Sequence, residues 1–182
     1  MKIGITGGIG SGKSYVCQLL KQRGIEVYDC DSAAKRLMRT SAPLQQRLTA
    51  LIGNDTYLED GSLNKAVVAQ FLLASEENAK AIDAIVHPAV FEDYLRSGME
   101  WVESAILYES GLDKILDKVI VVTAPEEIRI ERIMQRDNIS AEKAKEWIAR
   151  QLPQETVREK ADYEIVNDGE TPLKPQIDQL FK

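Results

Sequence analysis

Short apolar runs alternate with longer amphipathic stretches along the chain of 182 residues. The short runs have the length and the β-branched content of strands, and they lie at residues 3–6, 26–28, 102–107, 119–123 and 163–166. The first and the fourth are almost continuously apolar, as is typical of strands that are buried on both faces of a parallel sheet. The pattern therefore predicts a mostly parallel sheet of five strands.

Helical patterns fill the intervals between these strands. They cover residues 13–23, 125–136, 141–160 and 172–182. Such an alternation of strands and helices is typical of a doubly wound α/β sheet. The interval between the second and third strands is longer than one crossover. Two or three helices across residues 32–96 are therefore predicted to form an insertion, interrupted by turn residues at 53–61.

The composition is that of an ordinary globular protein, with 44% apolar and 29% charged residues. The net charge of −6 argues against nucleic acid as a partner, because nucleic-acid binders usually carry a basic surface. No apolar run approaches the length of a membrane span, and the first strand follows the N-terminus without the pattern of a secretory leader. Two cysteines, Cys17 and Cys30, fit a reducing compartment. These features predict a cytoplasmic protein without a membrane partner, and they leave the oligomeric state open.

A glycine-rich motif follows the first predicted strand and precedes the first predicted helix. It matches the pattern G-x-x-x-x-G-K-[ST] and reads Gly7-Gly8-Ile9-Gly10-Ser11-Gly12-Lys13-Ser14. Glycines allow backbone angles at which successive N–H groups converge on phosphate oxygens, and the helix that follows adds its N-terminal partial charge. Lys13 is predicted to reach the β and γ phosphates of a nucleoside triphosphate, and the Ser14 hydroxyl to ligate Mg²⁺.

The sequence excludes one large class of phosphate-loop proteins, the GTPases. These proteins carry a D-x-x-G switch and an N-K-x-D base-reading motif. No aspartate of this chain is followed three residues later by glycine, and Asn64-Lys65 continues with Ala66 and Val67. The GTPase interpretation is therefore discarded.

Two aspartates, Asp29 and Asp31, stand at the end of the second predicted strand. Parallel strands end at the same edge of their sheet, so these carboxylates are predicted to emerge near the phosphate loop. A carboxylate there can accept the proton of an attacking hydroxyl or help to hold Mg²⁺. Asp31 fits a second interpretation equally well, as the cap of a helix that starts near Ser32. The residues alone leave both interpretations open.

Other polar residues have a structural interpretation at this stage. His87, the single histidine, lies in an apolar helical stretch and is predicted to be a core residue. Glu103 and Glu109 are predicted to lie near the same strand edge as the phosphate loop, and capping or surface solvation is the alternative interpretation of each. The basic residues between 129 and 160 could supply local positive charge for an anionic ligand, but most of them alternate with glutamates, as is typical of a solvated helix surface.

Taken together, these motifs resemble those of the dephospho-coenzyme A kinase family, and the resemblance extends over essentially the whole chain. It rests on the order and spacing of several segments, which are residues 5–14, Asp29-x-Asp31 with Ala34-Lys35-Arg36, His87-Pro88, residues 108–112, Arg132-x-x-x-Arg136-Asp137, Arg150-Gln151 and residues 161–169. The family phosphorylates the ribose 3′-hydroxyl of dephospho-coenzyme A with ATP and Mg²⁺. The resemblance implies one P-loop kinase domain over residues 1–182, a three-layer α/β sandwich with a helical substrate-binding insertion at about 32–98 and a mobile helical lid at about 137–160.

The resemblance also implies roles for particular residues. Asp31 would be the base that faces the 3′-hydroxyl, with Asp29 beside it as a support or a metal-side acid. Arg136 and Arg150 would reach the transferring phosphoryl group from the lid, on the side opposite Lys13. The residues implied to bind ATP are Gly8, Gly10, Ser11, Gly12, Lys13, Ser14, Tyr15, Asn167 and Gly169, and those implied to bind dephospho-coenzyme A are Asp29, Asp31, His87 and Glu109.

The chain departs from the family pattern at a few positions. Tyr15 stands in place of a usual threonine, Glu103 in place of aspartate and Ala105 in place of proline, while the phosphate motif is intact. Two alternative functions are another P-loop kinase that acts on a nucleotide or nucleoside, and a sensor that binds ATP without turnover. The paired aspartates followed by His-Pro argue against the first. The presence of Lys13, Asp31 and the lid arginines argues against the second.

Overall fold

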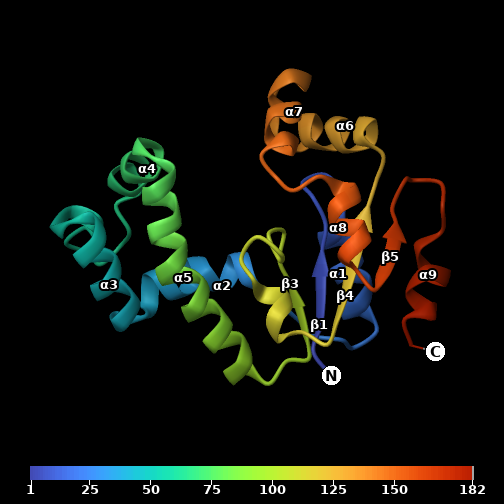
Figure 1. Cartoon of the computed structure of the whole chain (residues 1–182), viewed down its shortest axis with the longest axis horizontal. Helices are drawn as coiled ribbons and strands as arrows, with labels where there is room; N and C mark the ends of the chain where they lie inside the picture. Colours follow the sequence, from blue (N-terminus) through green and yellow to red (C-terminus); the bar gives the residue numbers. More distant parts are fainter. Residues whose placement is uncertain (182) are drawn as a thin grey trace. The chain divides into compact units, whose positions relative to one another are not determined.

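A computed structural model describes residues 1–181, which form two compact units (Figure 1). The core unit comprises Met1–Tyr28 and the described residues from Met99 onward, and the helical unit comprises Asp29–Gly98. The helical unit spans nearly the same residues as the insertion predicted at 32–98. Within residues 1–181, no helix is both long enough and apolar enough to cross a membrane.

The core unit is built on a five-stranded parallel sheet with the strand order β2-β3-β1-β4-β5. The strands are β1 (Ile3–Thr6), β2 (Val27–Asp29), β3 (Trp101–Glu103), β4 (Lys118–Thr123) and β5 (Tyr163–Val166). β1 lies between β3 and β4, and Ile5 is opposite Glu103 on one side and Ile120 on the other. The predicted α/β fold with five strands is confirmed, and the sheet is parallel throughout.

The third strand is shorter than the predicted run at 102–107. The N–H of Ser104 donates to the carbonyl of Ile5 on β1 (3.0 Å), and the Ser104 hydroxyl then accepts from the N–H of Ile106 (3.3 Å). A serine that bonds to the nearby backbone competes with the ladder of a sheet, and the chain turns away here. The prediction of a longer strand was wrong, because the apolar pattern continues through the turn, where Leu107 is buried.

Helices cover both faces of the sheet. In the core unit they are α1 (Lys13–Gln22), α6 (Glu126–Asp137), α7 (Ala141–Ala149), α8 (Gln154–Lys160), α9 (Leu173–Gln179) and the short 3₁₀ helix η2 (Leu112–Ile115). Leu20 of α1 and Ile177 of α9 pack with Ile120 of β4 in one buried cluster. The next residue of β4, Val121, points to the opposite face and lies beside Val157 of α8. Both sets of β4 side chains are therefore buried, as the continuous apolar pattern predicted.

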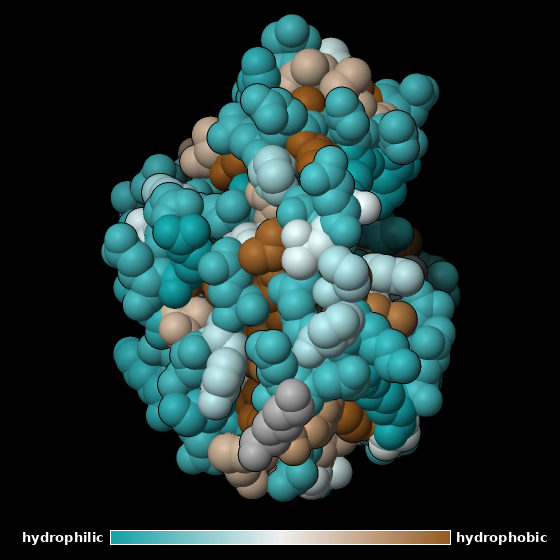
Figure 2. All heavy atoms as spheres, turned by 90° about the vertical axis from the view of Figure 1, so that its right-hand side faces the viewer, coloured by the Kyte–Doolittle hydropathy of each residue, from teal (hydrophilic) through white to brown (hydrophobic). Residues whose placement is uncertain are grey.

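The edge strand β5 is protected by α9. The side chain of Gln176 accepts from the N–H of Val166 (2.8 Å) and donates to its carbonyl (2.9 Å). Unpaired backbone groups at a sheet edge invite association with another chain, and these two bonds occupy such a pair. The face that carries α9 and β5 is mainly hydrophilic, with hydrophobic residues in narrow strips (Figure 2).

The single helix predicted at 141–160 is two helices, α7 and α8. Pro153 has no backbone N–H and disfavours helical angles at the residue before it, and it forms the N-cap at which α8 begins as a new helix. Gln154 begins α8 and exchanges two hydrogen bonds with the backbone of Ala124, which follows β4 (3.2 and 3.1 Å). This exchange ties α8 to the sheet and leaves α6 and α7 beyond the carboxyl ends of β1 and β4 (Figure 1).

The helical unit contains four α-helices, where the sequence predicted two or three. They are α2 (Cys30–Thr40), α3 (Ala42–Ile52), α4 (Lys65–Ala74) and α5 (Glu76–Ser97), with a 3₁₀ helix η1 (Asn54–Thr56) in the predicted interruption. Ile82, Val86 and Val90 recur every four residues on α5 and are buried. Helices α2, α3 and α4 all contact α5, so this stripe forms the core of the unit.

Candidate active site

The phosphate loop connects β1 to α1 at the carboxyl edge of the sheet. Gly10 and Gly12 have φ angles of 80° and 85°, in the left-handed region that favours glycine. A Cβ atom on Gly10 would lie 2.6 Å from the carbonyl oxygen of Arg129, so the loop packs directly on the backbone of α6. Across the described part of the chain, the N–H groups of Gly10, Gly12, Lys13 and Ser14 meet no acceptor. Unused donors at the start of a helix are the arrangement that binds phosphate.

Lys13 is the first residue of α1, and its ammonium group forms an ion pair with Glu103 at the end of β3. The two side chains are 11% and 15% exposed, so the pair is largely shielded from water. Since β3 pairs directly with β1, the sheet brings Glu103 to the phosphate loop. Glu103 thus lies at the strand edge where the sequence placed it, and its largely shielded ion pair with Lys13 rules out the alternative interpretation as a capping or solvated acid.

Arg132 and Asn167 hold the carbonyl groups of the loop. Arg132 Nη1 donates to the carbonyls of Gly10 and Ser11 (3.3 Å each), and its Nη2 donates to the carbonyl of Asn167 (2.9 Å). Asn167 is buried, and its Nδ2 donates to the Ser11 carbonyl (2.9 Å). In the structure the side chain of Asn167 supports the loop, while the adenine contact implied for Asn167 and Gly169 stays a prediction.

Ile9, at the tip of the loop, is held by two side chains that the sequence did not single out as site residues. Its carbonyl accepts from Arg129 Nε (2.9 Å), and its N–H donates to Gln151 Oε1 (2.7 Å). Arg129 belongs to the segment interpreted as a solvated helix surface, but it is only 5% exposed. That interpretation was wrong for Arg129, because periodicity alone does not show which helix face meets the loop.

The two predicted lid arginines lie on the surface of the core unit. Arg136 is exposed and forms an ion pair with Asp137 (2.7 Å), and Arg150 is exposed at the end of α7. A small apolar cluster of Ile130, Ile133 and Ala144 joins α6 to α7. The action of these arginines on a phosphoryl group stays a prediction.

The paired aspartates begin the helical unit and have different local roles. Asp29 is the N-cap of α2, and it accepts from the N–H (3.1 Å) and the hydroxyl (2.7 Å) of Ser32. Asp31 lies in the first turn of α2, its side chain is 79% exposed, and it pairs with Lys35 (2.5 Å). The cap interpretation of Asp31 was therefore wrong, because the helix starts two residues earlier than expected and Asp29 caps it.

His87 lies on α5 in the same unit. Its side chain is 23% exposed, its Nε2 lies 3.6 Å from Asp83 Oδ1, and its ring stacks on Phe91 with the ring centroids 6.2 Å apart. It is therefore a partly buried residue at the border of the α5 core. Its contact with a substrate stays a prediction.

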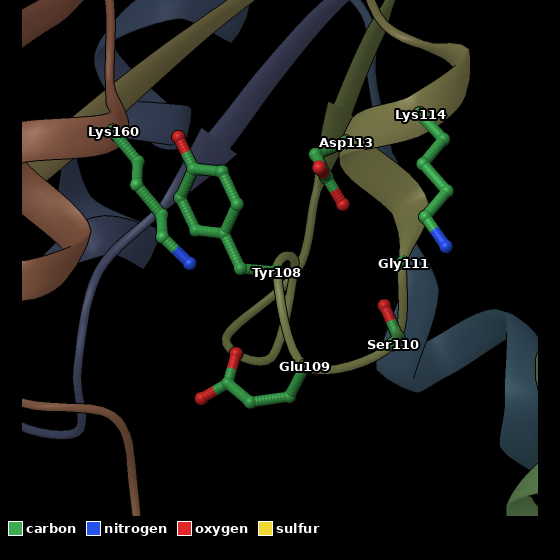
Figure 3. A pocket seen from close by; sticks show the side chains of 7 residues that line it. All are labelled: Tyr108, Glu109, Ser110, Gly111, Asp113, Lys114 and Lys160. Atoms are coloured by element: carbon green, nitrogen blue, oxygen red, sulfur yellow. The ribbon is translucent and has the colours of Figure 1, made fainter.

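An open pocket of about 490 Å³ lies beside the loop that follows β3 (Figure 3). Its lining includes Tyr108, Glu109 and Lys160, and the Lys160 ammonium lies 5.4 Å from the centre of the Tyr108 ring. Burial raises the pKa of the Tyr108 hydroxyl to about 12, and Asp113 and Asp162 act in the same direction. Glu109 turns away from this ring and accepts from the N–H of Leu152 (3.3 Å). Glu109 thus links the loop after β3 to the segment between α7 and α8.

The residues present fit a magnesium nucleotide. Ser14 is exposed beside the unused N–H groups of the loop, as is Tyr15. No group of three or more His, Cys, Asp or Glu residues that could hold a metal occurs among the residues the structure describes. Mg²⁺ characteristically takes one or two protein ligands together with substrate phosphates. Ser14 with the phosphates of ATP matches that pattern.

A glycine-rich loop between the central parallel strand and a helix, with a lysine as the first helical residue, defines a P-loop nucleotide-binding protein. The family model for dephospho-CoA kinase matches residues 1–172. A dephospho-CoA kinase of Bacteroides fragilis is 40% identical over 192 residues, which cover 100% of this chain and 91% of that protein. The chain belongs to the dephospho-CoA kinase family, as the resemblance of its motifs predicted.

Solved structures share the fold of this chain. A crystal structure of TT1252 from Thermus thermophilus is 30% identical with a TM-score of 0.82, and the match covers 100% of this chain and 95% of that one. Dephospho-CoA kinase from Campylobacter jejuni, at 22% identity, shares the fold with a TM-score of 0.69 over 100% of this chain and 96% of that one.

Proposed function

We propose that the protein transfers the γ-phosphoryl group of ATP to the ribose 3′-hydroxyl of dephospho-CoA and releases CoA and ADP. Membership of the dephospho-CoA kinase family carries this proposal. The phosphate loop supports it, because its unused N–H groups and the shielded Lys13 suit the binding of a triphosphate. The final step of CoA synthesis is the metabolic role that follows.

At the phosphate end of the site, Lys13 exchanges its ion pair with Glu103 for contacts to the β and γ phosphates. The Ser14 hydroxyl would hold Mg²⁺, which when bound would offset the charge that develops on the phosphate oxygens. Arg136 and Arg150 act from the lid on the equatorial oxygens of the transferring group. Asn167 and Gly169 lie beside the adenine.

At the acceptor end, Asp31 takes the proton of the 3′-hydroxyl. The 3′-oxygen forms its bond to the γ phosphorus while the bond from that phosphorus to the β–γ bridging oxygen breaks, and the electron pair leaves with ADP. Asp31 is suited to this role because its carboxylate is exposed and therefore accessible to a hydroxyl. Asp29, His87 and Glu109 are further residues proposed to bind dephospho-CoA.

A coupled assay that measures ADP release tests the proposal. Dephospho-CoA is offered as acceptor beside the common nucleoside monophosphates and shikimate, with ATP and Mg²⁺ in each case. We expect turnover with dephospho-CoA and at most background rates with the other acceptors. Preferred turnover of a nucleoside monophosphate would make the protein a different nucleotide kinase. ATP binding without turnover of any acceptor would make it a sensor.

A further inference from the structure

Arg129 is a buried cation whose role the proposed reaction leaves open. It lies on α6, it is 5% exposed, and within residues 1–181 no carboxylate oxygen comes within 4.0 Å of its guanidinium group. Burial lowers the pKa of Arg129, and Glu126, one turn earlier on α6, opposes this effect from a distance. A buried charge without a partner of opposite sign is costly for a folded protein. Such a group calls for a compensating negative charge.

The hydrogen bond of Arg129 orients one peptide of the phosphate loop. Its Nε donates to the carbonyl of Ile9, and that carbonyl shares a peptide plane with the N–H of Gly10. The described peptide bonds are all trans, so the carbonyl and the N–H of this plane point in opposite directions. With the carbonyl held towards α6, the N–H of Gly10 is directed away from α6. This N–H is among the unused donors of the loop.

The guanidinium group also packs against the loop beside this peptide. A Cβ atom on Gly8 would collide with Arg129 Nη2 and would lie 3.2 Å from Gln151 Oε1. Gln151 in turn accepts from the N–H of Ile9 (2.7 Å). The peptide groups on both sides of Ile9 are thus fixed, one by a cation and one by a neutral amide. Only the cation adds charge to the site.

We propose that Arg129 is a positioning residue for the nucleotide phosphates, which turns the Ile9–Gly10 peptide so that its N–H faces them and places a water-shielded positive charge behind the loop. The inference rests on the proposed function, since it takes the phosphates of ATP and ADP as the anion that compensates this charge. Arg129 stabilises the bound phosphates through the loop and does not touch the transferring group.

This role predicts an effect on affinity rather than on the chemical step. An interaction that is equal in the ground and transition states changes the binding of substrate and leaves kcat in place. Arg129→Gln should therefore weaken ADP and ATP by a similar factor of about 10 or more, the scale of one charge acting in a shielded site. The kcat at saturating ATP should stay within about three-fold of the wild type.

The test compares Arg129→Gln with Arg158→Gln, which removes an exposed arginine of α8 that pairs with Glu155 (2.8 Å). The dissociation constant of ADP is measured by calorimetry, and kcat and KM for ATP by the coupled assay. We expect Arg158→Gln to bind ADP within about two-fold of the wild type, as befits an exposed charge. Arg129→Lys keeps the charge but lacks the planar fork that donates to Ile9, so it should recover only part of the lost affinity.

Three results would overturn the inference. One is an Arg129→Gln protein that is less stable but binds ADP like the wild type, since Arg129 would then be only structural. A second is a collapse of kcat with unchanged affinity, since Arg129 would then act on the transferring group. The third is a loss of ADP affinity in Arg158→Gln that equals the loss in Arg129→Gln. If the wild type binds ADP but does not phosphorylate dephospho-CoA, the proposed reaction fails while the binding comparison still decides the role of Arg129.

Discussion

The ion pair between Lys13 and Glu103 engages the cation that the phosphate loop offers to the β and γ phosphates. Both side chains are largely shielded, so each charge depends on the other while the phosphates are absent. Lys13→Ala removes the cation aimed at the β and γ phosphates. We expect turnover to fall by about 10²-fold or more, as for the loss of one preorganised electrostatic group. Steady-state kinetics with dephospho-CoA and ATP measure this loss.

Lys13→Ala also leaves the carboxylate of Glu103 without its partner, and this side effect needs a separate control. The double variant Lys13→Ala/Glu103→Gln removes the stranded charge. It should recover much of the thermal stability that the single variant loses, but none of the activity. A single variant with wild-type turnover would refute the assignment of the phosphate loop.

Asp31 is the second residue at which one substitution separates two roles. Its side chain is exposed and pairs with Lys35, and an exposed ion pair of this kind contributes little to stability. We expect Asp31→Asn to lower turnover by roughly 10² to 10⁴, the usual range for a general base, while ATP affinity stays nearly unchanged. Lys35→Gln breaks the same ion pair and keeps the carboxylate, so it should retain most of the activity. Equal activity of the two variants would show that Asp31 is not the base.

At the scale of elements, the phosphate loop and α7 share an apolar contact. Ile9 packs against the cluster of Ile130, Ile133 and Ala144 that joins α6 to α7, and Gln151, just after α7, bonds to the N–H of Ile9. A nucleotide that immobilises the loop should therefore restrain α7. We expect amide hydrogen exchange across residues 137–150 to slow when a non-hydrolysable ATP analogue is added. The amides of α9, which packs on β5, serve as the internal reference. Exchange in α7 that is unchanged at saturating analogue would contradict the lid interpretation.

Arg136, at the end of α6, provides a chemical test of the same element. Its guanidinium is exposed and bonded to Asp137, so it is available to a ligand without disturbing the core. A planar fork binds two phosphoryl oxygens at once and a lysine ammonium does not. Arg136→Lys should therefore lower kcat much more than it raises the dissociation constant of ATP. An unimpaired Arg136→Lys enzyme would leave the exposed arginines of this region as ordinary surface charges.

Prediction from the sequence succeeded for the elements whose structure is determined by their own residues. The apolar runs of β1, β4 and β5 and the glycines of the loop each specify their own local structure, and all were found where predicted. The predictions failed where tertiary contacts decide. Glu103 became the partner of Lys13 through the pairing of β3 with β1, and Arg129 became buried because α6 packs on Gly10. Neither contact leaves a periodic signal in the chain.

At the scale of the whole molecule, the charged residues determine how the stability of the folded state depends on pH. The net charge is −6, yet Lys13, Arg129 and Arg132 gather at the phosphate loop. Several acidic residues accept hydrogen bonds that favour their ionised form. Asp60, Asp162 and Asp168 each have a pKa below the ordinary value of 3.8 for this reason. The lowered pKa values of these carboxylates predict that the folded state loses stability in acid.

Asp162 is the best site for testing this prediction, because it joins β4 to the start of β5. Its carboxylate accepts from Lys118 Nζ (2.7 Å) and from the N–H of Val119 (2.9 Å), and these bonds lower its pKa below 3.8. As the pH falls, the unfolded chain therefore takes up this proton before the folded protein does. The stabilising contribution of Asp162 is complete above pH 3.8 and disappears as the pH falls through the lowered pKa.

Asp162→Asn removes the titrating charge and keeps the shape of the side chain. Urea unfolding from neutral pH into acid should show a stability difference between wild type and Asp162→Asn that is constant near neutrality and shrinks below pH 3.8. Other carboxylates titrate alike in both proteins, so they cancel in the difference. A difference that persists unchanged into acid would mean that the amide is a poorer fit than the acid for reasons other than charge.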